Sequence, residues 1–155
     1  MIYADTREKK NGHITKYFDK HNIKYMTKVV RTGDYINPDN PKVIIERKQN
    51  LLEIATNITQ DHDRFKRELA RLDNIDGKMY ILIEEKIGSL EDVQKWVSPL
   101  KHDGTPYTKM TGNVLYKYMV SWQFKHNIEY IFCDKDKTAI KILELLEGDS
   151  PACNK

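Results

Sequence analysis

Four polar residues near the start of the chain could together hydrolyse a phosphodiester bond with the help of a divalent cation. Asp5 follows a short apolar run, Asp34 follows Gly33, and Glu46 and Lys48 end a later apolar run. Carboxylates at the ends of strands can hold magnesium, which neutralises phosphate charge and helps to turn water into a nucleophile. In such a site Glu46 would bind the metal. Lys48 would position the attacking water or stabilise charge on the phosphate in the transition state.

The positions of these residues along predicted strands decide whether they can meet. Side chains alternate along a strand, so Glu46 and Lys48 would share one face while Arg47 points away. Asp34 lies twelve positions before Glu46 and could reach the same cleft if the strands around it pair as a hairpin, and Asp5 could join them. An aspartate followed at a distance by Glu-x-Lys also occurs by chance in charged chains. The pattern alone therefore allows a metal site but does not identify one.

The remaining sequence predicts the elements that must hold these groups. Runs of apolar and β-branched residues predict strands over residues 2–4, 23–30, 43–45, 79–83 and 128–133. Apolar residues at helical spacing predict helices over residues 13–21, 51–72, 113–126 and 137–146, with a short helix over 90–97. This order favours the α/β fold class, with a mixed central sheet that is flanked by helices on both faces.

The composition excludes several classes of protein. The 155 residues are enough for one domain with its own core, and 39% hydrophobic with 32% charged residues is typical of a soluble globular protein. A net charge of +3 is only a weak argument for a polyanionic partner. Apolar runs are short and Asp5 comes before any signal-type core could form, so we expect neither export nor a membrane span.

Cysteine and histidine patterns predict no further site. Cys133 and Cys153 lie far apart, which disfavours a disulfide framework or a zinc site of cysteines and fits a reducing, cytosolic setting. The histidines show no convergent spacing. We therefore expect no histidine metal site.

Three segments that contain the four polar residues resemble, in order and spacing, the signature of the xeroderma pigmentosum group F (XPF) nuclease family. These are Asp5-Thr6-Arg7-Glu8, Gly33-Asp34-Tyr35 and Ile45-Glu46-Arg47-Lys48. The similarity continues in the later segments Asp63-Arg64-Phe65, Arg71-Leu72 and Tyr80-Ile81-Leu82-Ile83-Glu84. The resemblance implies a restriction-endonuclease-like core of the PD-(D/E)xK type, dependence on Mg²⁺ or Mn²⁺, and cutting of branched or flapped DNA, usually by a dimer.

The resemblance also implies roles for individual residues. Asp34 and Glu46 would be the principal metal ligands, with the backbone carbonyl of Arg47 as a third. Lys48 would be the catalytic lysine. Asp5 matches an acidic position of the family's first motif, which makes it a less central member of the catalytic and metal-binding set.

Three further residues would support the site according to the same resemblance. Glu8 matches a second acidic position of the first motif, Arg7 would organise the site or touch a phosphate, and Arg64 matches a helix arginine that faces the cleft. For Arg7 and Arg64 the alternative is an ion pair with a neighbouring acid, such as Glu8 or Glu68. Tyr35 is expected to pack rather than to catalyse.

Members of the XPF family commonly carry a tandem helix-hairpin-helix module after the nuclease domain, whereas this sequence ends at residue 155. We therefore expect a stand-alone XPF-type nuclease domain over residues 1–147 and a flexible C-terminal tail over residues 148–155. Compact forms of this kind resemble versions found in phages and prophages, and the lysine-, isoleucine- and asparagine-rich composition suits an AT-rich genome. This predicts a protein of the cytoplasm, in a bacterial host cell if a phage encodes it.

Two segments leave alternatives open. The loop over residues 98–109 contains Lys101 and Lys109, which could contact a DNA backbone or an unpaired base, although a plain solvated loop is the simpler interpretation. Further on, a stripe of residues at helical spacing predicts either core or a dimer interface. The stripe consists of Leu115, Tyr118, Met119 and Trp122.

The leading hypothesis is a magnesium- or manganese-dependent endonuclease that cuts branched DNA, such as a flap, fork or Holliday junction, in phage replication, recombination or repair. We expect it to act as a homodimer, without a membrane or a small-molecule cofactor. One alternative is a less selective nuclease that attacks single-stranded or duplex DNA. Another is a catalytically silent DNA- or partner-binding subunit. Such a subunit would be expected to lose Asp34, Glu46 or Lys48, and all three are present.

Overall fold

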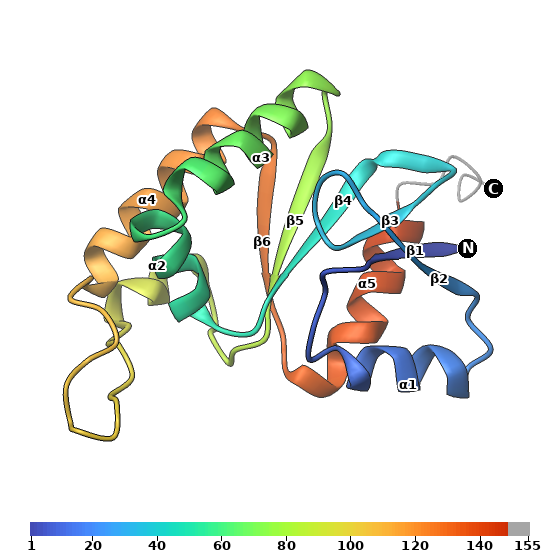
Figure 1. The fold of residues 1–155 in the computed structure, drawn as a ribbon. Coiled ribbons are helices and arrows are strands. Elements are labelled where there is room, and N and C mark those ends of the chain that lie inside the picture. Colours follow the sequence, from blue (N-terminus) through green and yellow to red (C-terminus); the bar gives the residue numbers. More distant parts are fainter. Residues whose placement is uncertain (149–155) are drawn as a thin grey trace.

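The fold is built on a six-stranded sheet, seen in a computed structural model that describes residues 1–148 (Figure 1). The strands lie in the order β2-β1-β3-β4-β5-β6. They are β1 (Ile2–Asp5), β2 (Tyr25–Lys28), β3 (Tyr35–Asn37), β4 (Asn40–Lys48), β5 (Lys78–Ile83) and β6 (Ile128–Phe132). The first two run parallel, as do the last three, while β3 is antiparallel to its neighbours β1 and β4. The predicted α/β class with a mixed central sheet is therefore confirmed.

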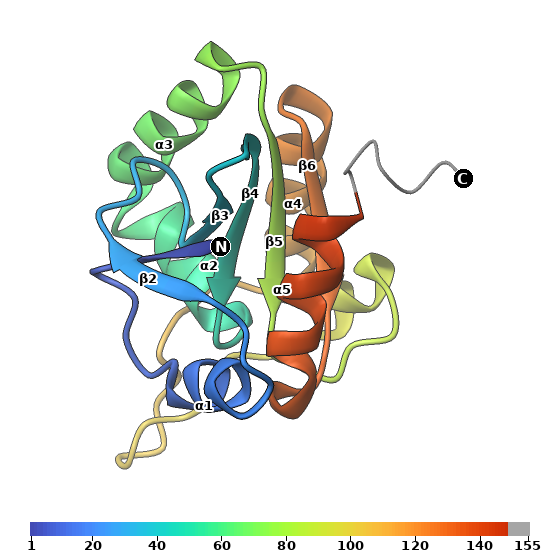
Figure 2. The same cartoon turned by 90° about the vertical axis from the view of Figure 1, so that its right-hand side faces the viewer.

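Helices cover both faces of this sheet (Figures 1 and 2). One face packs against α1 (Gly12–Lys20) and α5 (Thr138–Glu147), with the short 3₁₀ helix η2 (Lys135–Lys137) before α5. The other face packs against α2 (Leu51–Thr59), α3 (His62–Asn74), α4 (Gly112–Lys125) and the 3₁₀ helix η1 (Leu90–Lys95). In the part of the chain that is described, no helix is long and apolar enough to cross a membrane.

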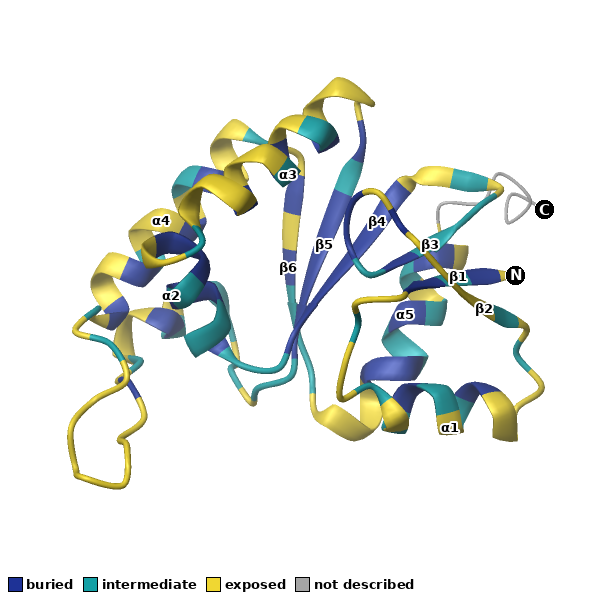
Figure 3. Ribbon diagram, viewed as in Figure 1, coloured by how far each residue is buried: buried dark blue, intermediate teal, exposed yellow. Residues whose placement is uncertain are grey.

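The alternation of side chains along β4 divides its residues between two cores. Ile44 joins the core under α2, α3 and α4, whereas Ile45 joins the core under α1 and α5. Figure 3 shows that β4 and β5 are buried along most of their length. The same alternation directs the side chains of Glu46 and Lys48 toward α2 and α3, and that of Arg47 toward α1.

The hairpin that carries Asp34 differs from the predicted one. The segment 23–30 forms only the short strand β2, which pairs with β1 at the edge of the sheet rather than with β4. A strand that was not predicted, β3, pairs with β4 instead, with Tyr35 opposite Ile45. Three residues are too few to show a periodic pattern, and they merge into the turn-forming residues that follow.

The prediction of one helix over residues 51–72 is wrong, because two helices, α2 and α3, occupy this segment. Asn50 caps α2, since its side chain accepts a hydrogen bond from the Glu53 amide at 3.1 Å. No apolar residue stands between Ile58 and Phe65, so a continuous helix would have no apolar face to bury there. The break allows α2 and α3 each to pack its own apolar face against the sheet.

The predicted C-terminal boundary stays a prediction. Helix α5 ends at Glu147, and Gly148 follows it in a turn. The rest of the predicted tail, residues 149–155 with Cys153, lies outside the described residues.

An ionic cluster under α1 fixes the end of β4 to neighbouring elements. The Arg47 guanidinium donates to both oxygens of Glu8, at 2.7 and 2.9 Å, and to Glu84 directly after β5. Glu84 also accepts from the Thr138 hydroxyl at 2.6 Å and lies 2.6 Å from His13 Nε2. Burial alone would raise the pKa of Glu84, but the hydrogen bond from Thr138 and the other two partners hold it below its usual value. The cluster therefore ties α1, β4, β5 and α5 together.

We expect Glu84→Gln to lower the free energy of unfolding by about 3 kcal/mol near neutral pH, because the buried Arg47 loses a charged partner. A carboxylate whose pKa is lowered in the folded state contributes stability above its unfolded pKa and loses it as the pH falls through the folded value. In urea unfolding, the difference between wild type and variant should therefore shrink below about pH 4. Glu91→Gln, at an exposed position in η1, is the matched control. A difference that stays constant with pH would contradict this role of Glu84.

Candidate active site

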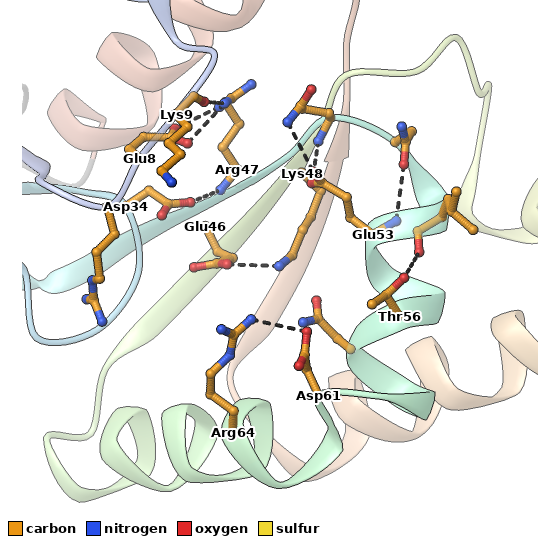
Figure 4. Close-up of a pocket in the computed structure, with 15 residues that line it drawn as sticks. Glu8, Lys9, Asp34, Glu46, Arg47, Lys48, Glu53, Thr56, Asp61 and Arg64 are labelled. Atoms are coloured by element: carbon orange, nitrogen blue, oxygen red, sulfur yellow. Dashed lines mark hydrogen bonds and ion pairs between the residues drawn. The ribbon is translucent and has the colours of Figure 1, made fainter. Parts of the chain in front are cut away.

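The charged end of β4 opens into a cavity of about 430 Å³ between the sheet and helices α2 and α3 (Figure 4). Asp34, Glu46 and Lys48 line this cavity, and all three also line an adjoining cavity of about 240 Å³ that includes Asp5. Figure 4 shows the side chains of Glu46 and Lys48 side by side on the same side of β4, with Asp34 on the neighbouring segment. The fold thus brings Asp34 next to Glu46 and Lys48, which follow it by twelve and fourteen positions in the sequence.

Asp34 reaches the cavity because a tight turn precedes β3. Gly33 has φ +75°, and a Cβ at this position would lie 2.2 Å from Cγ2 of Ile44, so only glycine fits. The Asp34 amide donates to the Ile45 carbonyl at 2.8 Å. Its carboxylate accepts from the Arg47 amide at 2.7 Å. Strand β4 therefore holds both the backbone and the side chain of Asp34.

Glu46 and Lys48 form a buried ion pair on the side of β4 that faces α2 and α3. Lys48 Nζ donates to Glu46 Oε1 at 3.0 Å and lies 5.5 Å from the centre of the Phe65 ring. Burial raises the pKa of Glu46 to about 7, although the Lys48 charge offsets part of the rise. Burial alone would lower the pKa of Lys48, but the carboxylates of Glu46 and Asp34 outweigh it and raise this pKa. Lys48 is therefore an ammonium at neutral pH.

The carboxylates around this ion pair repel one another. Burial, followed by the charges of Glu46 and Glu8, raises the pKa of Asp34 well above its usual value. Glu68, on α3, contributes to the raised pKa of Glu46 and accepts a hydrogen bond from the Gly33 amide at 2.8 Å. A divalent cation between Asp34 and Glu46 would relieve this repulsion.

The donor atoms in the cavity suit magnesium or manganese. Asp34 and Glu46 supply carboxylate oxygens. Asn57 lines the same cavity, and its side-chain oxygen is buried without a hydrogen-bond partner among the described residues. Within residues 1–148, no cluster of three or more His, Cys, Asp and Glu side chains is arranged to hold an ion. Two carboxylates are nevertheless sufficient for Mg²⁺, which keeps several waters and can bind substrate phosphate.

Asp5 lies at the edge of the site with both carboxylate oxygens engaged. One accepts from Arg7 Nε at 2.7 Å, and the other accepts from the Val30 amide at 2.9 Å. Arg7 also donates to the Val30 carbonyl at 2.8 Å, so these contacts fix the segment after β2 against the end of β1. Asp5 lines the smaller of the two cavities, and its role as a metal ligand stays a prediction.

The predicted supporting residues after β1 and on α3 also reach the site. Arg7 and Glu8 line the larger cavity, and Glu8 pairs with Arg47 rather than with Arg7. Arg64 lines both cavities and pairs with Asp61 at 3.2 Å rather than with Glu68. The Arg64 side chain is 70% exposed, so this pair is weak and leaves Arg64 able to turn toward a phosphate.

Lys101 and Lys109 are not brought to the site. They lie on the exposed loop between η1 and α4, away from the residues that line both cavities. The loop folds back on itself through a bridge between Leu100 and Pro106, and Lys101 Nζ lies 6.0 Å from the centre of the Tyr107 ring. In Figure 1 this loop extends away from the helices. Its contact with DNA stays a prediction.

Two residues of the site were not predicted to take part in it. Asn57 is a buried polar residue in the otherwise apolar stripe of α2, and this mismatch is a signal that could have indicated it. Glu68 was considered only as an ion-pair partner. It carries no such signal, because most of the surface of α3 is charged.

The chain matches the ERCC4 domain family over residues 4–146, a range that includes the whole of the cavity. It belongs to the ERCC4 domain family. This is the XPF-type nuclease family that the sequence motifs resemble, and its restriction-endonuclease-like fold agrees with the mixed sheet described above. No curated protein matches the sequence of this ERCC4 domain significantly.

Solved structures with the same fold as this ERCC4 domain include two of XPF from Aeropyrum pernix. One matches with a TM-score of 0.65 and 21% identity, and the other, a complex with DNA, matches with a TM-score of 0.64 and 20% identity. Both comparisons cover 94% of this chain but only 63% and 62% of the XPF chains. This ERCC4 domain therefore spans less than two thirds of the proteins that it resembles, and the likeness at this identity concerns the fold.

Gly33→Ala tests how the ERCC4 domain places Asp34. The added Cβ would clash with Ile44 and would also force alanine into a left-handed conformation. We expect the free energy of unfolding, measured in urea, to fall by about 3 kcal/mol. Gly104→Ala is the matched control, because Gly104 has φ +83° but nothing within 4 Å of the new Cβ. It should lose only about 1 kcal/mol from backbone strain. Equal losses in the two variants would show that Ile44 does not constrain the turn.

Proposed function

We propose that this ERCC4 domain is a Mg²⁺- or Mn²⁺-dependent endodeoxyribonuclease that hydrolyses phosphodiester bonds in branched DNA, such as a flap, fork or Holliday junction. The observation that carries the proposal is the placement of two carboxylates and one ammonium, those of Asp34, Glu46 and Lys48, in one cavity. Membership of the ERCC4 domain family supports nuclease chemistry.

Each group has its own task in the proposed reaction. Asp34 and Glu46 would hold the cation, with the Arg47 carbonyl as a third ligand. When bound, the cation supplies Lewis-acid activation of the phosphate and of the attacking water. Lys48 is protonated, so it acts as a hydrogen-bond donor and positive charge toward that water or the phosphate rather than as a base. Arg7, whose side chain is 69% exposed at the cavity, can contact a phosphate oxygen.

The preference for branched DNA and the biological setting are the finer parts of the proposal. The preference rests on the motifs shared with the XPF family and agrees with the existence of an XPF structure in complex with DNA. We also propose a role in phage DNA replication, recombination or repair, in the cytoplasm of a bacterial host cell. The support for this setting is the composition, which is rich in lysine, isoleucine and asparagine.

A panel of labelled DNA substrates tests the activity together with the Glu46→Gln variant. Flap, fork, Holliday-junction, single-stranded and duplex DNA are incubated with Mg²⁺, with Mn²⁺ and with a chelator. We expect cuts near the branch with either cation and none with the chelator. In Glu46→Gln one carboxylate is lost at nearly constant side-chain size. Single-turnover cleavage should then fall about 100- to 1000-fold while DNA binding, measured by fluorescence anisotropy in Ca²⁺, is kept.

The control for this experiment is Asp136→Asn, at an exposed carboxylate before α5, which should change neither cleavage nor binding. Cleavage that survives Glu46→Gln would rule out the proposed cation site. Equal cleavage of single-stranded, duplex and branched DNA would favour the less selective nuclease. Binding of DNA without any cleavage by the wild type would favour the catalytically silent subunit.

We further propose that the domain acts as a homodimer through the outer side of α4. In the predicted stripe on this helix, Tyr118 is 41% exposed, while the other three residues, Leu115, Met119 and Trp122, are buried in the core. On the outward side, Phe124 is 92% exposed. Its neighbour Gln123 lines a cavity together with Phe132 of β6, the strand at the edge of the sheet among the described residues. Exposed aromatic surface beside an open sheet edge is typical of an association site.

Sedimentation velocity over the micromolar concentration range tests this association. We expect the wild type to form a dimer and Phe124→Lys to shift toward monomer, because a lysine in the interface would lose its hydration without a partner. Val29→Lys, at a 74% exposed position in the segment after β2, is the control and should leave the dimer intact. A wild type that is monomeric at every concentration would reject the proposal.

A further inference from the structure

A separate cavity of about 300 Å³ lies beside the proposed cleavage site, at the C-terminal end of α3. Its lining includes Val30 and Ile44, which are 2% and 1% exposed, and Ile75, which is 41% exposed. The cavity therefore has an apolar floor and an apolar group at its entrance. Ile36 and Pro41 also line the cavity. Its polar groups are those of Arg31, Thr32, Arg71 and Asn74. A small cavity with an apolar interior and a few polar groups is typical of a site for a small organic group.

Arg71 connects this cavity to the proposed cleavage site. It lines the apolar cavity and also the smaller of the two cavities at Asp34. Its Nε is buried and has no hydrogen-bond partner among the described residues, so a donor is left for a ligand. A guanidinium can stack on a base and can also donate to a phosphate oxygen, which suits a position between a base site and a phosphate site.

The two sites are also close along the elements that line them. Segment 30–34 contributes Val30 to the apolar cavity and Asp34 to the cleavage site. On α3, Glu68 lines the cleavage site and Asn74 lines the apolar cavity. Six residues of helix correspond to roughly 9 Å at 1.5 Å per residue. This is about the length of two or three nucleotide steps at the ~3.4 Å spacing of stacked bases.

We propose that the apolar cavity receives an unpaired nucleobase of the DNA strand whose phosphate lies at Asp34 and Glu46, an inference that rests on the proposed endonuclease function. The apolar side chains contact the faces of the base, and the Arg71 guanidinium stacks on it. The Asn74 amide and the Thr32 hydroxyl can form hydrogen bonds with its polar edge. A base that stays paired in a duplex cannot enter. The cavity therefore favours DNA with an unpaired nucleotide close to the cut, and this gives the branch preference a physical basis.

Abasic substitution tests the proposal without depending on cleavage. The probe is a fluorescent flap in which the unpaired nucleotides next to the junction are replaced, one at a time, by an abasic residue. Affinity is measured in Ca²⁺. We expect one position at which the abasic residue weakens binding to the wild type about tenfold, as the loss of one stacked base would. Equal affinity for the intact flap and every abasic flap would overturn the proposal.

Two variants locate the base in the cavity. The sensitive abasic flap is the one whose abasic residue weakens binding to the wild type. Ile75→Ser and Arg71→Lys should bind the intact flap about as weakly as the wild type binds this abasic flap. Their affinity for the abasic flap should not be lower still. The controls should keep the discrimination. They are Val29→Ser, at an exposed position next to the cavity-lining Val30, and Arg67→Lys, at an exposed position of α3. If Ile75→Ser and Arg71→Lys weaken binding but still discriminate, the base lies elsewhere and the proposal fails.

A second measurement does not depend on how the variants fold. In protein with labelled isoleucine methyl groups, Ile36, Ile44 and Ile75 should show resonance shifts with the intact flap that are absent with the sensitive abasic flap. Ile14, buried under the other face of the sheet, should not respond. Identical shifts with both flaps would overturn the proposal. If the protein distinguishes the intact from the abasic flap but does not cleave DNA, the endonuclease proposal fails and the base cavity stands. If it cleaves DNA but does not distinguish the two flaps, the base cavity fails and the endonuclease proposal stands.

Discussion

The fold depends on the burial of three consecutive charged residues at the end of a central strand. Glu46, Arg47 and Lys48 are only 8%, 5% and 8% exposed. A buried charge is costly unless it is paired, so each of these residues requires partners. Side chains alternate along β4, so these charges lie on opposite faces of the sheet. On one face Arg47 pairs with Glu8 and Glu84, and on the other Glu46 pairs with Lys48. The elements that end near β4, including the segment after β1 and the end of β5, are placed so that they supply these partners.

The two faces at this strand end differ in their balance of charge. Under α1, the Arg47 guanidinium is held by two carboxylates and a backbone carbonyl, which makes this face rigid. On the face toward α2 and α3, Lys48 meets Glu46, with further negative charge nearby from Asp34. The raised pKa values of Asp34 and Glu46 express the cost of this arrangement. Binding of a cation would relieve this cost, as expected at a functional site.

Much of this arrangement follows from rules that act locally in the sequence. Strand alternation predicts that Glu46 and Lys48 share a face, and long apolar runs predict the central strands. Strand β3 and the break between α2 and α3 were missed or misplaced, because a three-residue strand and a short polar break leave no periodic signal. The spacing of residues along the sequence also cannot predict contacts between distant segments. Examples are the pairing of Arg47 with Glu8 and Glu84, and the cavity that segment 30–34, β4 and α3 form together.

Hydrogen bonds to three different parts of the fold hold segment 30–34 in place without a ligand. The Val30 amide donates to Asp5, the Gly33 amide donates to Glu68, and the Asp34 amide donates to the Ile45 carbonyl. A carboxylate on a segment fixed in this way needs little rearrangement to bind a cation, which is the property expected of a preorganised site. The same segment lines the apolar cavity, so the fold would set the distance between a base in that cavity and a cation at Asp34. With that distance fixed, the position of the unpaired base along the strand would determine which phosphate lies at the cation. Selection of the cut position would then follow from the rigidity of the domain.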